Sequence, residues 1–170
     1  SKAKRGVKVK LLIDAIGSQK LEISHENLQD LKDAGGEYHF FMSLIKKPFL
    51  SRLNLRNHRK MIVVDSTSVM SGGINISELY LSFDDDSGSL WRDISFVIEG
   101  SAALQYEEIF KSNWETDTDT KIKKNAIKDD ELSVGNSLIQ VVASGPDLSR
   151  DVLYEALLLA IYRANSRIRI

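Results

Sequence analysis

The stretch from His58 to Asn75, HRKMIVVDSTSVMSGGIN, decides how this chain folds and where its chemistry lies. Its apolar run, MIVVD, is short and bounded by polar residues, which is typical of a strand covered on both faces. The residues SVMSGGI read as a second strand, reached through a turn at DSTS. We therefore expect two neighbouring strands, with His58 and Asn75 at ends that lie side by side.

Side chains on the first strand alternate between its two faces. If the strand begins at His58, then His58 and Lys60 point to the same face, so that an imidazole and an ammonium share one surface. The pair Gly72–Gly73 allows a close backbone approach and brings Asn75 back beside them. The expected result is a cluster of a nucleophile, a cation and a carboxamide.

This combination of groups suits a substrate that carries a negative charge and develops more of it during reaction. Phosphodiesters are the obvious candidates, because histidine can attack phosphorus while lysine and asparagine hold the non-bridging oxygens. No cluster of aspartate, glutamate and histidine in the sequence has convincing metal-ligand spacing. We therefore expect catalysis without a metal or another cofactor.

The composition excludes several classes of protein. The 170 residues are 42% hydrophobic and 28% charged, which suits one domain with a substantial core, or one domain with an appendage. The absence of cysteine excludes disulfides and thiolate catalysis, and a net charge of -1 means that any basic site is local. No apolar run approaches the ~20 residues that cross a bilayer, so we expect this chain as given to be soluble.

Strands and helices alternate along most of the chain. Further strands are expected at VKVKLLID, YHFFM and DISFVIEG, and helices at AALQYEEIFKSNW and at HENLQDLKDAGG, which its two glycines stop. Leu104, Ile109 and Phe110 supply the expected core-facing stripe of the helix AALQYEEIFKSNW. The pattern predicts an α/β or α+β fold with a mixed sheet flanked by helices.

The carboxyl-terminal part has a different composition. Residues 115–137 are polar and mixed in charge, and they read as a linker. Residues 138–170 follow a plan of strand, helix and strand, with Ser149 as the expected helix cap and RIRI as the last strand. We therefore expect three segments, residues 1–114, 115–137 and 138–170.

The spacing H-x-K-x4-D-x6-G-G-x-N resembles the HKD motif of the phospholipase D superfamily, and it is filled by His58, Lys60, Asp65, Gly72, Gly73 and Asn75. The segments GVKVKLLIDAIGS, RLNLRNHRKMIVVD, GGINISELY, WRDISFVIEG, IFKSNW and VVASGPD resemble segments of bacterial cardiolipin synthases in the same order. The resemblance implies a phospholipase D-like catalytic half-domain over residues 1–114, with residues 138–170 as the start of a second half.

The resemblance also implies a role for each residue of the motif. His58 is the expected nucleophile that forms a phosphohistidine, and Lys60 and Asn75 are expected to bind the phosphoryl oxygens. Asp93, in WRD, matches the carboxylate that fixes the tautomer of the histidine and stabilises its charge. The aspartate of the motif has a role that looks more structural than chemical. The candidate catalytic residues are therefore His58, Lys60, Asp65 and Asp93, and the candidate substrate-binding residues are Asn75, Gly72, Gly73 and Arg56.

Two features depart from the superfamily pattern. The pair Gly72–Gly73 stands where many members have Gly-Ser, which leaves one hydroxyl fewer to hold phosphate. The chain also has a single HKD motif, so the second histidine and lysine are expected from another part of a longer protein or from a homodimer partner. One hypothesis is that Asp151–Ile170 fills a sheet position vacated by missing amino-terminal elements, which requires Ile168–Ile170 to lie in a sheet.

Three functions stay open on the sequence. The first is a cardiolipin synthase-like phosphatidyltransferase that acts on phosphatidylglycerol, with Phe40–Arg56 approaching a membrane surface. Its full-length form is expected at the cytoplasmic face of the bacterial inner membrane. The second is a phospholipase D-type phosphodiesterase that hydrolyses lipid or nucleic acid, although a single basic segment disfavours nucleic acid. The third is a catalytically inert interaction module.

Overall fold

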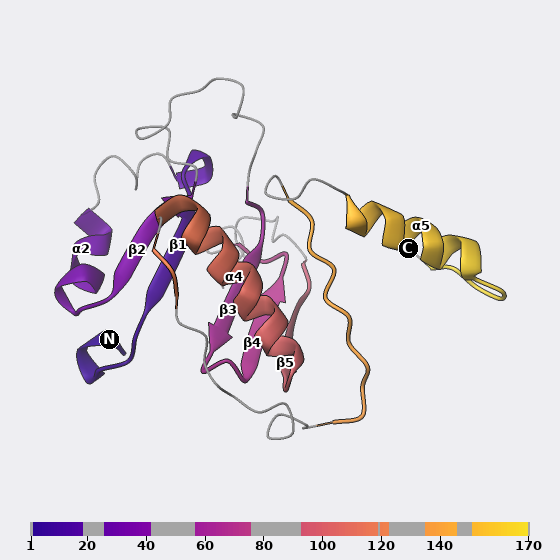
Figure 1. Ribbon diagram of the computed structural model, residues 1–170, viewed down its shortest axis with the longest axis horizontal. Helices are drawn as coiled ribbons and strands as arrows, with labels where there is room; N and C mark the ends of the chain where they lie inside the picture. Colours follow the sequence, from indigo (N-terminus) through magenta and orange to yellow (C-terminus); the bar gives the residue numbers. More distant parts are fainter. Residues whose placement is uncertain are drawn as a thin grey trace, which may run out of the picture. The chain divides into compact units, whose positions relative to one another are not determined.

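The computed structural model describes residues 2–18, 26–41, 57–75, 93–118, 120–122, 135–145 and 151–169 (Figure 1). In chain order its elements are η1 (Ala3–Arg5), β1 (Lys10–Asp14), η2 (Ile16–Ser18), α2 (Glu26–Asp33), β2 (Glu37–Phe41), β3 (Lys60–Val64), β4 (Ser68–Gly72), β5 (Ser95–Glu99), α4 (Ala102–Thr118) and α5 (Val152–Arg163). Parallel and antiparallel strand pairs both occur among them, together with helices. The predicted α/β or α+β class is confirmed, and among the described residues the parallel and antiparallel pairs form two separate sheets.

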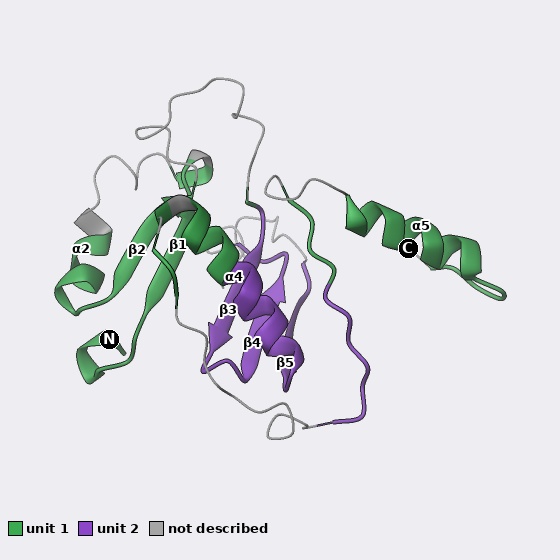
Figure 2. Ribbon diagram, in the orientation of Figure 1, with its two compact units in different colours: residues 1–57, 111–122, 142–170 green, residues 58–110, 123–141 purple. Residues whose placement is uncertain are grey.

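The chain divides into two units, which Figure 2 shows in different colours. Unit 1 comprises residues 1–57, 111–122 and 142–170, and unit 2 comprises residues 58–110 and 123–141. Helix α4 begins in unit 2 and ends in unit 1. The sequence predicts a catalytic half, a linker and the start of a second half. This division is not tested by the two units and stays a prediction.

Unit 1 is built on the parallel pair β1–β2, in which Lys10 lies opposite Glu37 and Asp14 lies opposite Phe41. Both strands run in the same direction, so Asp14 and Phe41 lie together at their carboxyl ends. The backbone N–H of Ala15 donates to the carbonyl of Phe41, which extends the pairing beyond the last residue of β1. The carboxyl end of β1 is therefore a fixed part of unit 1.

Helix α2 covers this pair and ends where the sequence predicts. Leu28 of α2 is buried with Ala15 and Phe40 in a small core. Gly35 follows the helix with φ of +83°, and its N–H donates to the carbonyl of Lys32 at 2.9 Å. Only glycine adopts this left-handed conformation without a steric cost. The predicted glycine stop is confirmed.

Unit 2 is built on the antiparallel sheet β3–β4–β5. Strands β3 and β4 are joined by a tight turn in which Asp65 and Ser66 have φ of +50° and +59°. The N–H of Thr67 donates to the carbonyl of Val64 at 3.1 Å and closes the turn. Two consecutive residues with positive φ match the twist of a hairpin, and aspartate tolerates this conformation better than most residues. The predicted turn at DSTS is confirmed.

One face of this sheet differs from the prediction. The paired residues Ile62, Met70 and Val97 form a row across the three strands, and they are 55%, 45% and 66% exposed. Val69 points to the other face and is 1% exposed. The prediction that MIVVD is covered on both faces is therefore wrong, because an antiparallel sheet needs to bury only one face.

Helix α4 also differs in detail from the sequence-based expectation. It continues past Trp114 to Thr118. Leu104, Ile109 and Phe110, the expected core-facing stripe, are only half-buried, whereas Trp114 is fully buried. The buried residues of α4 therefore lie at both of its ends, with Ala102 and Ala103 at the start and Asn113 and Trp114 near the end, rather than along the predicted stripe.

The carboxyl-terminal part contains a helix but not the predicted strands. Residues 138–145 and 167–169 lie in no strand, and Ile170 is outside the described residues. The hypothesis that Asp151–Ile170 fills a vacated sheet position is therefore wrong as far as the chain is described. The cap of α5 is Asp151, whose carboxylate accepts the N–H of Tyr154 at 3.2 Å, while Ser149 is outside the described residues. No residue of α5 is buried.

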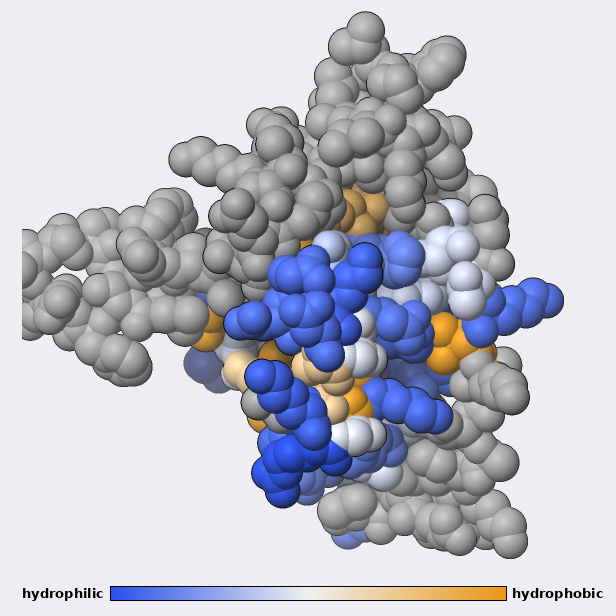
Figure 3. Space-filling model, turned by 90° about the vertical axis from the view of Figure 1, so that its left-hand side faces the viewer, coloured by the Kyte–Doolittle hydropathy of each residue, from blue (hydrophilic) through white to orange (hydrophobic). Residues whose placement is uncertain are grey.

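Hydrophilic residues predominate among the described residues on the face shown in Figure 3, and apolar residues form small separate patches there. Within the described ranges, no helix is both long and apolar enough to cross a membrane.

Candidate active site

The register of the antiparallel sheet brings three chain segments to one end of unit 2. Lys60, the first residue of β3, lies opposite Gly72, the last residue of β4, and Gly72 lies opposite Ser95, the first residue of β5. The start of β3, the end of β4 and the start of β5 therefore lie side by side in one row at the same end of the sheet. Any residue just before β3 or β5, or just after β4, extends from this same end of the sheet.

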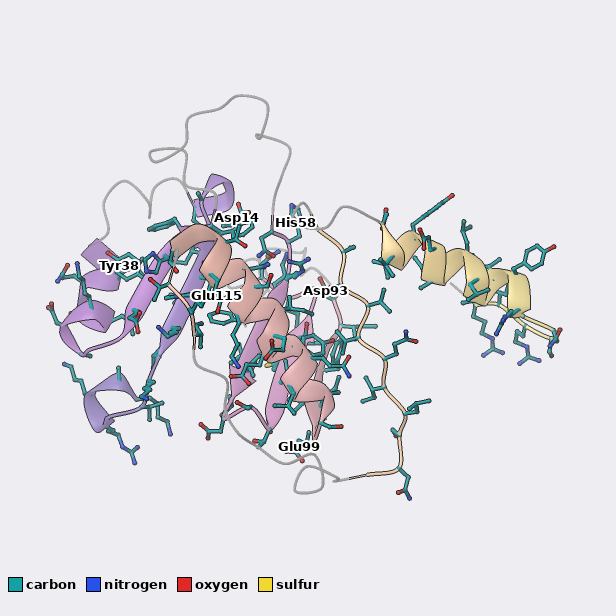
Figure 4. The ribbon with its side chains drawn as sticks, in the orientation of Figure 1. Asp14, Tyr38, His58, Asp93, Glu99 and Glu115 are labelled. Atoms are coloured by element: carbon teal, nitrogen blue, oxygen red, sulfur yellow. The ribbon has the colours of Figure 1, made fainter. Side chains whose placement is uncertain are left out.

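Three of the predicted site residues extend from this row. His58 lies two residues before Lys60, Asp93 lies two residues before β5, and Asn75 follows the two glycines that end β4. At about 3.3 Å per residue, His58 and Asp93 are within roughly 7 Å of the row along the chain. His58 and Asp93, labelled in Figure 4, are exposed, and Asn75 is half-buried. The sheet thus gathers an imidazole, an ammonium, a carboxamide and a carboxylate.

The structure corrects how His58 and Lys60 are related. Strand β3 begins at Lys60, so His58 precedes the strand instead of lying in it, and the shared face of the two side chains stays a prediction. The Nζ of Lys60 instead donates to the backbone carbonyl of His58 at 2.9 Å. The hydroxyl of Ser71 donates to the carbonyl of Lys60, also at 2.9 Å. Since an ammonium has three N–H donors, the bond to His58 does not exhaust the capacity of Lys60 for an anionic ligand.

The two glycines let the end of β4 lie directly against the segment that leads into β5. A Cβ atom on Gly72 would overlap the carbonyl oxygen of Ile94 and the backbone of Ser95. A Cβ atom on Gly73 would overlap the carboxylate of Asp93. The N–H of Gly73 donates to the carbonyl of Ile94 at 3.0 Å, so the approach is fixed by a hydrogen bond. Packing against backbone atoms therefore requires glycine at position 72, whereas at position 73 a Cβ atom would meet only the side chain of Asp93.

The carboxylate of Asp93 is held in place by the same packing. Its Oδ1 accepts the backbone N–H of Ile94 at 2.7 Å, and its side chain lies over the Cα of Gly73. This side chain is on the surface, and it borders the end of the sheet from which His58 extends. Asp93 thus lies at the same end of the sheet as His58, and its part as the carboxylate partner of the histidine stays a prediction.

Two predicted site residues are not part of this cluster. Asp65 lies in the turn at the opposite end of β3, five residues after Lys60, which is about 17 Å along an extended strand. Its exposed position and its φ of +50° point to a role in the turn. Arg56 lies outside the described residues.

The chain matches a family model over most of its length. Residues 1–114 match the model described as cardiolipin synthase, PLD-like domain. This chain belongs to the phospholipase D-like family. The resemblance on which the sequence analysis relied is confirmed.

The phospholipase D-like chain is also similar to curated proteins named cardiolipin synthase. It is 40% identical over 152 residues to one from Clostridium perfringens, covering 86% of this chain and 31% of the relative. It is 40% identical over 155 residues to one from Alkalihalophilus pseudofirmus, covering 89% of this chain and 30% of the relative. A relative from a Geobacillus species is 39% identical over 169 residues, covering 96% and 33%. The chain thus spans about a third of the length of these relatives. No solved structure matches it.

One group of residues in the phospholipase D-like domain was not predicted from the sequence. Asn57, just before His58, bonds through its backbone N–H to Asp14 and through its side chain to Asn113. All three occur in segments that carry the family resemblance, but nothing in a single sequence shows that they meet. Among the described residues, no group of three or more histidine, aspartate and glutamate side chains could hold a metal ion.

Proposed function

We propose that the protein is a phosphatidyltransferase of the cardiolipin synthase kind, which acts on phosphatidylglycerol through a phosphohistidine at His58. The observation that supports it is the gathering of His58, Lys60, Asn75 and Asp93 at one end of the β3–β4–β5 sheet, in a chain of the phospholipase D-like family. The relatives named cardiolipin synthase, which are about 40% identical, supply the substrate class.

In the first half-reaction, a ring nitrogen of His58 attacks the phosphorus of phosphatidylglycerol. A P–N bond forms as the P–O bond to the glycerol headgroup breaks, and glycerol leaves after taking a proton from a general acid. Lys60 and Asn75 donate hydrogen bonds to the non-bridging oxygens, where negative charge builds up. One such donor contributes about 3 kcal/mol to the stabilisation of a transition state.

In the second half-reaction, a hydroxyl of another phosphatidylglycerol attacks the phosphohistidine. The group that protonated glycerol now accepts the hydroxyl proton, the P–N bond breaks, and cardiolipin leaves with the phosphatidyl group. Asp93 holds the ring of His58 in the correct tautomer and stabilises its positive charge. Gly72 and Gly73 leave room for the phosphoryl group, and Arg56 adds positive charge for the lipid headgroup.

The general acid and base must come from outside this motif, since the chain has one HKD sequence. We propose that a second HKD half supplies the general acid and base, and that this half lies either in a longer protein or in a homodimer partner. Residues 1–114 then form the first catalytic half, residues 115–137 a linker, and residues 138–170 the start of the second half. The full-length protein acts at the cytoplasmic face of the bacterial inner membrane, with residues 42–56, which lie outside the described residues, near the lipid surface. Phe40 and Phe41, the first two residues of the predicted membrane segment, are buried in unit 1 instead.

The test is the conversion of phosphatidylglycerol vesicles by the protein that carries this chain. The His58→Ala variant should form cardiolipin and release glycerol at least about 10³-fold more slowly than wild type, because it has no nucleophile. His25→Ala is the matched control, since His25 lies outside the HKD motif. Cardiolipin formation that persists in His58→Ala contradicts the proposal. Phosphatidic acid as the product would instead indicate hydrolysis.

A further inference from the structure

The residue just before the proposed nucleophile is held by two long-range hydrogen bonds within unit 1. The backbone N–H of Asn57 donates to Oδ2 of Asp14 at 2.9 Å. The side-chain Nδ2 of Asn57 donates to Oδ1 of Asn113 at 2.7 Å. These partners are 43 and 56 residues away in the sequence. One backbone bond and one side-chain bond together fix both the position and the orientation of Asn57.

Each partner of Asn57 is itself fixed in unit 1. Asp14 ends β1, and its other carboxylate oxygen accepts the N–H of Gly17 at 2.9 Å. Asn113 is 1% exposed and precedes Trp114, which is fully buried. The ring of Trp114 packs edge-to-face on His39 of β2, with ring centroids 4.7 Å apart. Asn57 is therefore attached to a strand end and to a buried helical residue, both of which resist displacement.

We infer that Asp14, Asn57 and Asn113 form a positioning network that fixes the backbone from which His58 projects. His58 follows Asn57 directly, so the peptide bond that leads into His58 starts from an anchored residue. Figure 4 labels Asp14 and His58. This inference rests on the proposed role of His58 as a nucleophile and adds residues that do not touch the substrate.

The position of His58 matters because nucleophilic attack requires the reacting atoms to lie about 3–3.5 Å apart and aligned. A shift of ~1 Å in a catalytic group costs about 100-fold in rate, even when the fold is unchanged. Loss of one anchor of Asn57 should thus slow attack on phosphorus without weakening the binding of the phosphate, which the network does not contact. A lower rate of attack with unchanged phosphate binding therefore distinguishes a loss of positioning from a general loss of stability.

Two variants remove the anchors separately. Asp14→Asn keeps the size of the side chain but leaves one acceptor oxygen for the two N–H groups of Gly17 and Asn57. Asn57→Ala removes the bond to Asn113 and leaves the backbone bond to Asp14. Asp33→Asn is the matched control, because Asp33 is an exposed residue of α2 in unit 1 whose carboxylate accepts one side-chain bond.

The experiment measures phosphorylation of His58 in the full protein, with bis(p-nitrophenyl) phosphate as a generic phosphodiester. A ring nitrogen of His58 forms the P–N bond while one P–O bond breaks, and p-nitrophenolate is released and measured. Asp14→Asn and Asn57→Ala should lower the maximal rate about 10- to 100-fold and change the half-saturating concentration less than about twofold. Asp33→Asn should behave as wild type. Amide exchange at Asn57 should become faster in Asp14→Asn.

The outcomes separate this inference from the proposed function. If both variants phosphorylate His58 within about twofold of the wild-type rate, or if only the half-saturating concentration changes, the positioning network is wrong while the proposed function stands. An equal loss in Asp33→Asn also contradicts the network. If wild type phosphorylates His58 but makes no cardiolipin, the proposed function fails alone. If wild-type His58 is never phosphorylated, both are wrong.

Discussion

Gly72 and Gly73 are adjacent in the sequence but face different atoms. The space beside Gly72 is filled by the backbone of Ile94 and Ser95, which cannot move without breaking the β4–β5 pairing. The space beside Gly73 is filled by the carboxylate of Asp93, which can rotate away. The same substitution at the two positions should therefore have different consequences, one mainly for stability and the other mainly for catalysis.

Gly72→Ala should lower the free energy of unfolding by about 1–3 kcal/mol, because backbone atoms must shift. Gly73→Ala should change it by less than about 1 kcal/mol but slow cardiolipin formation about 10- to 100-fold, because it displaces Asp93. Urea denaturation and turnover of phosphatidylglycerol vesicles measure the two effects. Gly135→Ala is the control, since nothing lies within 4 Å of a Cβ atom there. Equal losses of stability in both variants would refute the distinction.

At the scale of elements, the antiparallel sheet of unit 2 positions the candidate site. The alternation of side chains along β4 buries Val69 and exposes Met70, and the register places Gly72 between Lys60 and Ser95. If the pairing of β4 slipped by one residue, the buried side chains would move to the exposed face, and Gly72 would no longer lie between Lys60 and Ser95. The buried face of the sheet and the geometry of the site thus depend on the same register.

Val69→Ala should therefore lower the free energy of unfolding of the protein by about 1–3 kcal/mol, since it leaves a cavity beneath the sheet. The control is Val97→Ala on β5, because Val97 is 66% exposed and loses little burial. Its effect should stay within about 0.5 kcal/mol. Urea denaturation followed by circular dichroism measures both. A loss in Val97→Ala as large as that in Val69→Ala would mean that the assigned faces of the sheet are wrong.

At the scale of the whole molecule, the proposed reaction needs a second set of catalytic groups besides the one that contains His58 and Lys60. It has a single HKD motif and spans about a third of the length of relatives named cardiolipin synthase. A nucleophile without a general acid and base leaves the departing alkoxide without a proton. The proposed activity therefore needs a second motif, in the same protein or in a second copy.

A protein that consists only of residues 1–170 should form no cardiolipin as a monomer. If two copies pair, activity should appear only in the dimer, and it should rise with the square of the protein concentration at low concentration. Size-exclusion fractions assayed on phosphatidylglycerol vesicles distinguish these cases. Activity in the monomer fraction that is proportional to concentration would show that one motif is sufficient.

The sequence was most informative where structure depends on neighbouring residues. The β3–β4 turn, the glycine stop of α2 and the strands themselves follow from local apolar patterns and turn residues, and the structure confirms them. The strands predicted at residues 138–145 and 167–170 were not found in the described residues, because a short apolar run fits a strand, a helix or an extended segment equally well. Helix α5 is capped by Asp151 instead of the predicted Ser149, because aspartate and serine are both favoured at this position and the sequence offers both.

The sequence by itself determined the family and the α+β class, and it supplied the candidate site residues. The tertiary structure decided which of them meet: it joins Asp93 to Gly73, separates Asp65 from Lys60, and ties Asn57 to residues 43 and 56 positions away. These facts depend on strand register and on contacts between distant segments. Local patterning does not encode such contacts, because they form only when the elements pack together.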